Sequence, residues 1–140
     1  MELIYRYNGK EYPDDSGHTI LPLTVNDLDI FNQHLALCGQ SGLTEAEWKE
    51  VYADGTEYFV LLIDGLPIAR ACIERYSPTA WETADVRVAK QYRNRRLGLA
   101  ITRHVTNIIR KSGITATIRT EQDNLPMKSI IEKSSFEPIC

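Results

Sequence analysis

Three stretches in the middle of the chain have the apolar, partly alternating pattern that is typical of β-strands. Asp64-Gly65 separates the first stretch from the second, and Ser77-Pro78 separates the second from the third. Both dipeptides favour tight turns between neighbouring strands. The pattern therefore predicts an antiparallel meander. Its three strands are residues 57–63, 66–76 and 81–89.

The apolar period then changes from that of a strand to that of a helix. Ile101, Val105 and Ile108 recur at helical spacing within residues 98–111, and a second strand-like run follows at residues 114–120. A strand, a loop, a helix and a strand in this order predict a crossover unit whose two strands are parallel. Asn124 is a suitable N-cap for a last helix.

The N-terminal residues have two short strand-like segments. Residues 1–12 predict a hairpin that turns at Asn8-Gly9, because both residues accept the positive φ of a type I′ turn. Residues 19–23 predict a further strand.

Two helices are predicted between these segments and the meander. Thr24 with Asp27 resembles a capping box and predicts the start of the first helix. Thr44 with Glu47 is a second capping box, and Trp48 lies on the apolar face of the helix that follows. We expect that face to pack against the core.

Composition and length favour one globular domain over residues 1–140, since 43% of the residues are hydrophobic and 25% are charged. The net charge of −3 gives no reason to expect nucleic acid or an anionic membrane as a partner. With no signal-like or membrane-length apolar run, the expected location is the cytoplasm. We expect free thiols at Cys38, Cys72 and Cys140, and no structural metal.

Residues 87–96, RVAKQYRNRR, are the segment where chemistry is expected. Five of these ten residues are basic and none is acidic. They stand between a predicted strand and the N-terminus of a predicted helix, whose free amides and partial positive charge attract phosphate. The segment therefore predicts a ligand that carries phosphate, with a solvated basic loop as the alternative.

The sequence from Asp85 to Val105, DVRVAKQYRNRRLGLAITRHV, resembles motif A of the GNAT acyltransferases. In that family a strand ending in V-x-V leads to a Q/R-x-x-G-x-G/A loop that opens a long helix. Arg93 aligns with the Q/R position and Gly98 with the final G/A. Asn124 followed by IIEKSSF resembles the family's N-x(6)-Y-E-K-x-G-F helix. The resemblance covers roughly residues 57–137.

The resemblance implies an α/β (α+β) GNAT fold: a mixed, mostly antiparallel sheet with helices on both faces, shortened at its C-terminal end. It implies transfer of an acetyl group from acetyl-CoA to a primary amine, on a small molecule or a peptide, by direct attack on the thioester. Glu82 is the candidate base, with Glu74 and Asp85 as weaker options. The residues implied to bind acetyl-CoA are Val86, Arg87, Val88, Arg93, Asn94, Arg95, Arg96, Leu97, Gly98, Leu99 and Asn124.

The sequence departs from the family pattern in the loop. Arg96 occupies the first glycine position of the motif, where an arginine can serve if its φ is negative. A rival register would place Gly98 and Ala100 on the G-x-A positions with Arg95 on the Q/R position, but it lengthens the loop.

The last helix and the chain end depart from the pattern as well. Ile131 stands where many relatives carry a tyrosine that protonates the leaving thiolate, and Ser135 replaces a glycine. These departures leave open a non-catalytic acyl-CoA-binding or regulatory module on the same fold. The N-terminal hairpin or a second subunit, as in a homodimer, is expected to cover the exposed sheet edge.

Overall fold

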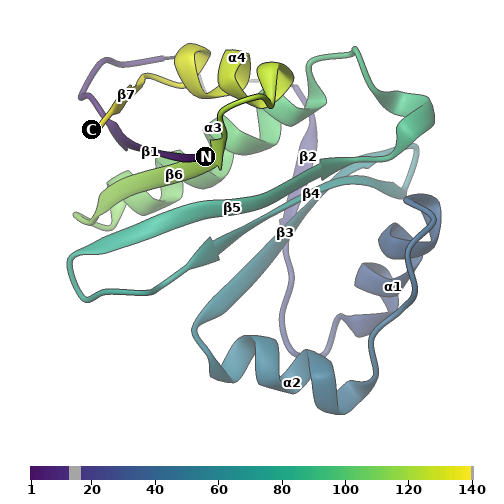
Figure 1. Cartoon of the computed structure of the whole chain (residues 1–140). Coiled ribbons are helices and arrows are strands. Elements are labelled where there is room, and N and C mark those ends of the chain that lie inside the picture. The colour runs from purple at the N-terminus through teal and green to yellow at the C-terminus, as the bar shows by residue number, and fades with distance from the viewer. Residues whose placement is uncertain (13–16, 140) are drawn as a thin grey trace.

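The computed structural model describes residues 1–12 and 17–139. These residues form one seven-stranded sheet in the order β2-β3-β4-β5-β6-β1-β7 (Figure 1). The strands are β1 (Glu2–Tyr7), β2 (Thr19–Pro22), β3 (Thr56–Ile63), β4 (Leu66–Glu74), β5 (Ala80–Val88), β6 (Thr115–Glu121) and β7 (Phe136–Pro138). The helices are α1 (Leu28–Leu37), α2 (Glu45–Ala53), α3 (Leu97–Lys111), α4 (Leu125–Lys133) and the single 3₁₀ turn η1 (Lys90–Tyr92).

The sheet is mixed and mostly antiparallel, as the fold class predicts. β3, β4 and β5 form the expected meander, and β5 and β6 form the one parallel pair among the described strands. The expected fold is therefore confirmed, including the crossover from β5 through α3 to β6.

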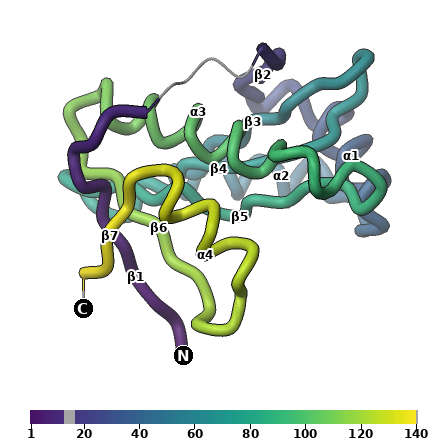
Figure 2. The backbone as a smooth tube through the Cα atoms, turned by 90° about the horizontal axis from the view of Figure 1, so that it is seen from above, coloured from purple at the N-terminus to yellow at the C-terminus, as the bar shows by residue number. Residues whose placement is uncertain are grey.

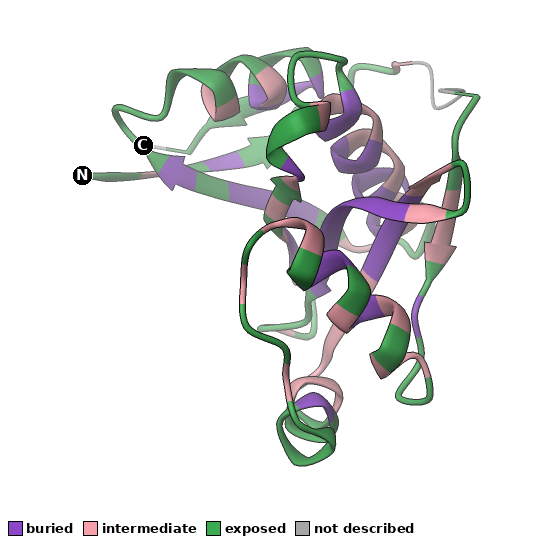
Figure 3. Cartoon of the chain, turned by 90° about the vertical axis from the view of Figure 1, so that its right-hand side faces the viewer, coloured by how far each residue is buried: buried purple, intermediate pink, exposed green. Residues whose placement is uncertain are grey.

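Helices cover both faces of the sheet. The ring of Tyr58 on β3 contacts Phe31 of α1 and stacks with Trp48 of α2, which places these two helices on one face. Phe59, the next residue of β3, packs with α3 in a separate core cluster on the other face. Because successive strand residues point to opposite faces, the two clusters are the two layers of the core (Figure 3).

The N-terminal hairpin prediction is wrong. Residues 2–7 form a single strand, β1, which lies between β6 and β7 and pairs antiparallel with both (Figure 2). Asn8 and Gly9 follow the strand as a turn in which only Gly9 takes a positive φ. The edge of β6 is therefore covered by the first strand of the same chain.

The two predicted N-terminal helix caps differ in outcome. Thr44 and Glu47 form the complete capping box of α2. Thr24 and Asp27 do bond to each other, but α1 begins only at Leu28, so the predicted start is wrong by one turn. The Asp27 carboxylate accepts a hydrogen bond from the Thr24 amide, in the turn that precedes the helix.

Cys38 and Cys72 are free thiols as expected, while Cys140 lies outside the described residues. No helix in the described part of the chain is long and apolar enough to cross a membrane.

Candidate active site

A split between the two parallel strands is the main feature of the candidate site. Backbone pairing of β5 with β6 covers three residue pairs and ends at Glu82 opposite Thr117. β5 continues for six further residues to Val88, and along this stretch it stays paired with β4 alone among the described strands. One edge of β5 is therefore free to bind a ligand.

The free edge exposes defined main-chain groups. The amide of Ala89 donates to the carbonyl of Ile68 on β4, at 2.9 Å. Since amide directions alternate along a strand, the amides of Val88 and Val86 point the opposite way, into the split. They can pair there with an extended amide-bearing chain.

A β-bulge at Asp85 interrupts the regular geometry of β5 beside this free edge. Asp85 has a φ of 50°, and the pairing of β4 with β5 shifts register between Arg70 and Cys72. A non-glycine residue in this region is strained by about 1–3 kcal/mol and needs support from its surroundings. Arg70 supplies it with two hydrogen bonds to the Asp85 carboxylate, at 3.0 and 3.2 Å, and Tyr58 adds a third at 2.6 Å.

The bulge also decides which side chains share a face. Thr83 bonds to Thr106 of α3, and Val86 and Val88 lie close to Gly98 of α3. Glu82 precedes Thr83 and therefore points to the opposite face. Six residues separate Glu82 from Val88, which in a regular strand would place them on one face, but the bulge puts them on opposite faces.

A cleft of about 640 Å³ opens on the α3 side of the split. It lies between the end of β5, the N-terminus of α3 and helix α4. Its size is within the range of small-molecule and cofactor sites. The lining residues are Val86, Arg87, Val88, Tyr92, Arg93, Asn94, Arg96, Leu97, Gly98, Leu99, Asn124, Pro126, Met127, Ser129, Ile130 and Lys133.

The electrostatics of the cleft are those of an anion site. Four lining residues are basic and none is acidic. Arg96, the N-cap of α3, makes no side-chain cap hydrogen bond, so the first-turn amides remain available to a ligand. The helix dipole, the free amides and the arginines all favour the binding of an anion in this cleft.

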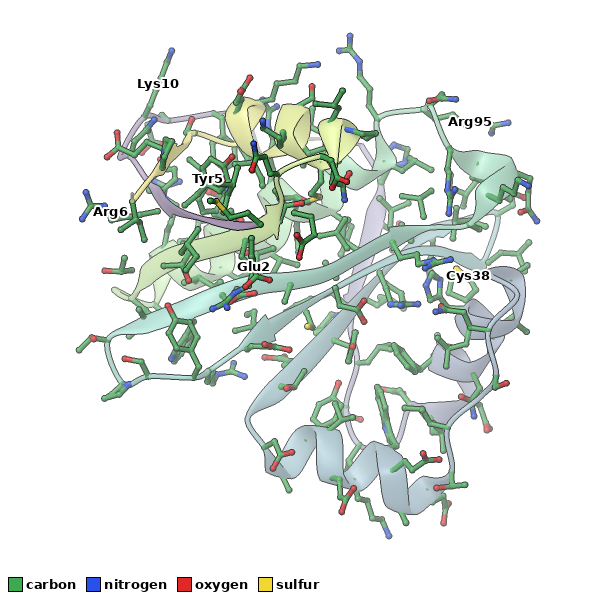
Figure 4. The ribbon with its side chains drawn as sticks, in the orientation of Figure 1. Glu2, Tyr5, Arg6, Lys10, Cys38 and Arg95 are labelled. Carbon is green, nitrogen blue, oxygen red and sulfur yellow. The ribbon has the colours of Figure 1, made fainter. Side chains whose placement is uncertain are left out.

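The structure gathers the predicted cofactor-binding residues around this one cleft, with Arg95 as the exception. Arg95 stacks on Tyr92, with its guanidinium carbon 5.2 Å from the ring centroid, on the loop before α3 (Figure 4). Arg93 bends back and donates from Nε to the carbonyl of Val88 at 3.2 Å. Asn124 caps α4 by accepting from the Met127 amide at 3.2 Å.

Arg96 does not have a negative φ. Its φ is 60°, which is the conformation a glycine would take at no cost. Gly98 sits where a Cβ would lie 3.0 Å from Ile130 and 3.7 Å from Val88. The chain thus keeps the close approach of α3, α4 and β5 at Gly98 but accepts strain at Arg96.

Sequence reasoning missed the contribution of α4 to the cleft. Met127, Ile130 and Lys133 lie at helical spacing on one face of α4 and line the cleft. The helical spacing of these residues was the only signal in the sequence, and it does not distinguish a cleft wall from the core. Ile131, in contrast, is fully buried in the core and does not line the cleft.

On the opposite face, Glu82 is only 6% exposed and its Oε1 accepts a hydrogen bond from Arg119 Nε at 2.8 Å. Burial raises the pKa of Glu82 above its ordinary value, while Arg119 opposes this. Glu74 is exposed on β4 opposite Glu82, and Asp85 is held by Arg70 and Tyr58. Of the three acidic candidates, Glu82 is the one at the point where the strands separate.

The chain matches the model of the acetyltransferase (GNAT) family over residues 28–136. It therefore belongs to the GNAT acetyltransferase family, and the resemblance drawn from its motifs is confirmed. No curated protein matches the chain by sequence.

Solved structures support the same fold. A GNAT-family acetyltransferase from Colwellia psychrerythraea superposes with a TM-score of 0.77 at 17% identity, over 99% of this chain and 52% of that one. An alanine N-acetyltransferase for a ribosomal protein, from Escherichia coli, gives 0.69 at 19% identity, over 86% and 77%. An aminoglycoside acetyltransferase from an uncultured soil metagenomic sample gives 0.69 at 15% identity, over 86% and 90%.

The chain spans 52–59% of three longer proteins of this fold, the Colwellia protein among them. At these identities the likeness shows the fold alone. The last two structures fit equally well, although a ribosomal protein and an aminoglycoside are very different acceptors.

Proposed function

We propose that residues 1–140 form a single acyltransferase domain that transfers the acetyl group of acetyl-CoA to a primary amine by direct attack on the thioester. One observation carries this proposal. The pairing of β5 with β6 stops at Glu82, and the split opens onto a basic cleft at the uncapped N-terminus of α3. A strand edge for an amide-bearing arm and a positive helix end for a diphosphate are thereby joined in one continuous site.

The residues present fit the parts of this co-substrate. Amides of Leu97, Gly98 and Leu99 at the helix end would hold the pyrophosphate, with Arg93 and Arg96 adding charge. The free edge of β5 would pair with the pantetheine arm. When bound, acetyl-CoA supplies an activated acyl carbonyl.

The chain's own groups then act on the two reacting atoms. The Val88 amide points into the split and would stabilise negative charge that develops on the thioester oxygen. Glu82, on the other face, would accept the proton of the attacking amine. Cofactor and acceptor would thus enter from opposite faces of the sheet, and the amine would meet the acyl carbon where the strands part.

Acetyl-CoA binding is tested by thermal unfolding. Saturating acetyl-CoA should raise the melting temperature, because a ligand that binds only the folded state stabilises it. The double variant Arg93→Met/Arg96→Met should lose most of that shift. Arg6→Met is the matched control, because Arg6 is an exposed arginine of β1 outside the cleft. An unchanged melting temperature at millimolar acetyl-CoA would contradict the proposal.

One observation favours a second candidate, a non-catalytic acyl-CoA-binding or regulatory module. Ile131 is fully buried and has no proton to give, so the cleft lacks the family's tyrosine at that position. Release of free thiol from acetyl-CoA with a panel of small amines and peptides separates the two candidates. Turnover with any acceptor excludes the module, whereas binding without turnover across the panel supports it.

A further inference from the structure

Besides the Arg70–Asp85 pair, a chain of hydrogen-bonded side chains links Glu82, Arg119 and Glu2 across the sheet. It lies at the point where the backbone pairing of β5 with β6 ends. Arg119 lies on β6, two residues beyond Thr117, the last residue that pairs with β5. Its Nε donates to Glu82 Oε1 at 2.8 Å, and its Nη1 donates to Glu2 Oε1 of β1 at 3.3 Å. Side chains from β5, β6 and β1 are therefore linked across the mouth of the split.

The N-terminal strand brings one end of this chain into place. β1 pairs with β6 so that Glu2 faces Glu121 and Ile4 faces Arg119. Glu2 and Arg119 are thus diagonal neighbours, near enough for long side chains to meet. Figure 4 shows Glu2 beside β6, near the middle of the molecule, and Arg6 at the far end of β1.

The surroundings of Glu82 disfavour a charged carboxylate. Its side chain is 8% exposed, and burial is the largest influence that raises its pKa. Glu74 and Cys72 face it from β4, and Glu2 faces it from β1. The guanidinium of Arg119, from β6, favours the ionised form against these groups.

We propose that Arg119 is a positioning residue for the Glu82 base: it keeps the carboxylate ionised and fixed at the mouth of the split, and Glu2 fixes Arg119 in turn. This rests on the proposed function, in which Glu82 takes the proton of the attacking amine. Oε1 is held by Arg119, so the proton goes to Oε2. As the new N–C bond forms, the C–S bond breaks and its electron pair leaves with the thiolate, while Arg119 keeps its charge.

The test is the pH profile of kcat/KM in Arg119→Met and Arg119→Lys. Removing the cation disfavours the ionised carboxylate, so the pKa of Glu82 rises. The acidic limb of the profile should therefore move to higher pH, by about one to three units in Arg119→Met and by less in Arg119→Lys. Activity should recover at high pH, which a purely structural loss would not allow.

Arg6→Met is the matched control. Arg6 is an exposed arginine of the same sheet, and its Nη2 lies 3.7 Å from Glu137. Its removal should leave the acidic limb in place. An acidic limb that stays unchanged in Arg119→Met would overturn the proposal.

A second readout does not depend on turnover. Titration of the Glu82 side-chain carboxyl carbon by NMR, in the unliganded protein, should give a higher midpoint in Arg119→Met than in the wild type. If Glu82→Gln retains full turnover, the base assignment of the proposed function fails, while this midpoint still decides the coupling. Arg119→Gln keeps an N–H donor without charge, and it carries the same test if Arg119→Met does not fold. An unchanged midpoint contradicts the proposal.

Discussion

The two faces of the sheet at the β5–β6 split are built in different ways. On the α3 side the anion-binding part of the site consists of main-chain amides, a helix end and a short basic loop from residues 86–99, and α4 lines the opposite wall. On the α1 side it consists of side chains from separate strands: Glu82 of β5, Arg119 of β6, Glu2 of β1 and the Arg70–Asp85 pair of β4 and β5. Under the proposed function, the first face would bind the co-substrate and the second face would bind the acceptor amine.

In the proposed function, β5 contributes to both faces. The amides of Val86 and Val88 would bind the cofactor, and Glu82 would act on the acceptor. The bulge at Asp85 is what lets β5 serve both, since it turns the strand between them. Changes on the two faces should therefore separate binding of the cofactor from the chemical step.

The largest effect is expected from Glu82→Gln. Loss of a general base costs about 10²- to 10⁴-fold in rate, so kcat should fall by that much. The acetyl-CoA dissociation constant should stay near that of the wild type, because Glu82 lies on the other face. Steady-state kinetics with calorimetric binding measures both quantities. A variant that loses acetyl-CoA affinity and keeps kcat would break the division between the faces.

The next effect tests the bulge. Asp85→Ala leaves Arg70, which is 5% exposed, as a buried cation without its carboxylate. Because Asp85 is 42% exposed and Gln40 still accepts a hydrogen bond from Arg70, the free energy of unfolding should fall by about 2 kcal/mol, less than for a fully buried pair. Chemical denaturation measures this.

The control for that variant is the partly exposed pair of Arg75, just after β4, and Glu57 of β3. Glu57→Ala should cost less than about 1 kcal/mol, because solvent screens the pair. Equal costs in the two variants would show that Asp85 does not hold the bulge.

The sequence predicted the residues of the cofactor face better than the contacts of the opposite face. The cofactor face was predictable because its loop, helix start and strand end are contiguous, and charge and turn chemistry are local signals. The contact of Arg119 with Glu82 spans 37 residues and depends on strand register that no local pattern specifies. β1 was predicted as part of a hairpin because Asn8-Gly9 is a strong turn signal, yet pairing with β6 and β7 buries Tyr5 in the core.

A third prediction concerns pH and the acceptor face. His34 of α1 is fully buried, its Nδ1 is 2.8 Å from the Pro67 carbonyl of β4, and burial lowers its pKa. A histidine that stays neutral when folded takes up its proton more readily when unfolded. The free energy of unfolding should therefore be intact above about pH 6.5 and fall below it, by at most about 1.4 kcal/mol per pH unit.

His34→Asn should flatten that slope, and denaturation midpoints across this pH range measure it. If the slope is the same with and without His34, the loss comes from other groups. The α1 layer would then not be the pH-sensitive part of the fold.

The smallest effect is expected from Arg96→Gly on the cofactor face. Glycine takes a φ of 60° without strain, so the variant should be more stable by about 1 kcal/mol. It also loses one positive charge of the cleft, so acetyl-CoA should bind more weakly. Thermal unfolding with and without the ligand measures both. A destabilised variant would show that the Arg96 side chain contributes more than its backbone strain costs.

Amide NMR of the isotope-labelled protein during titration with acetyl-CoA would locate the ligand on the backbone. The largest shift changes are expected at the amides of Val86, Val88 and the first turn of α3, residues 97–99, with little change in α2. The proposed site would be contradicted if the signals of these amides did not shift. It would also be contradicted if the shift changes were concentrated around the separate hollow of about 450 Å³ beside Leu23 and Tyr52.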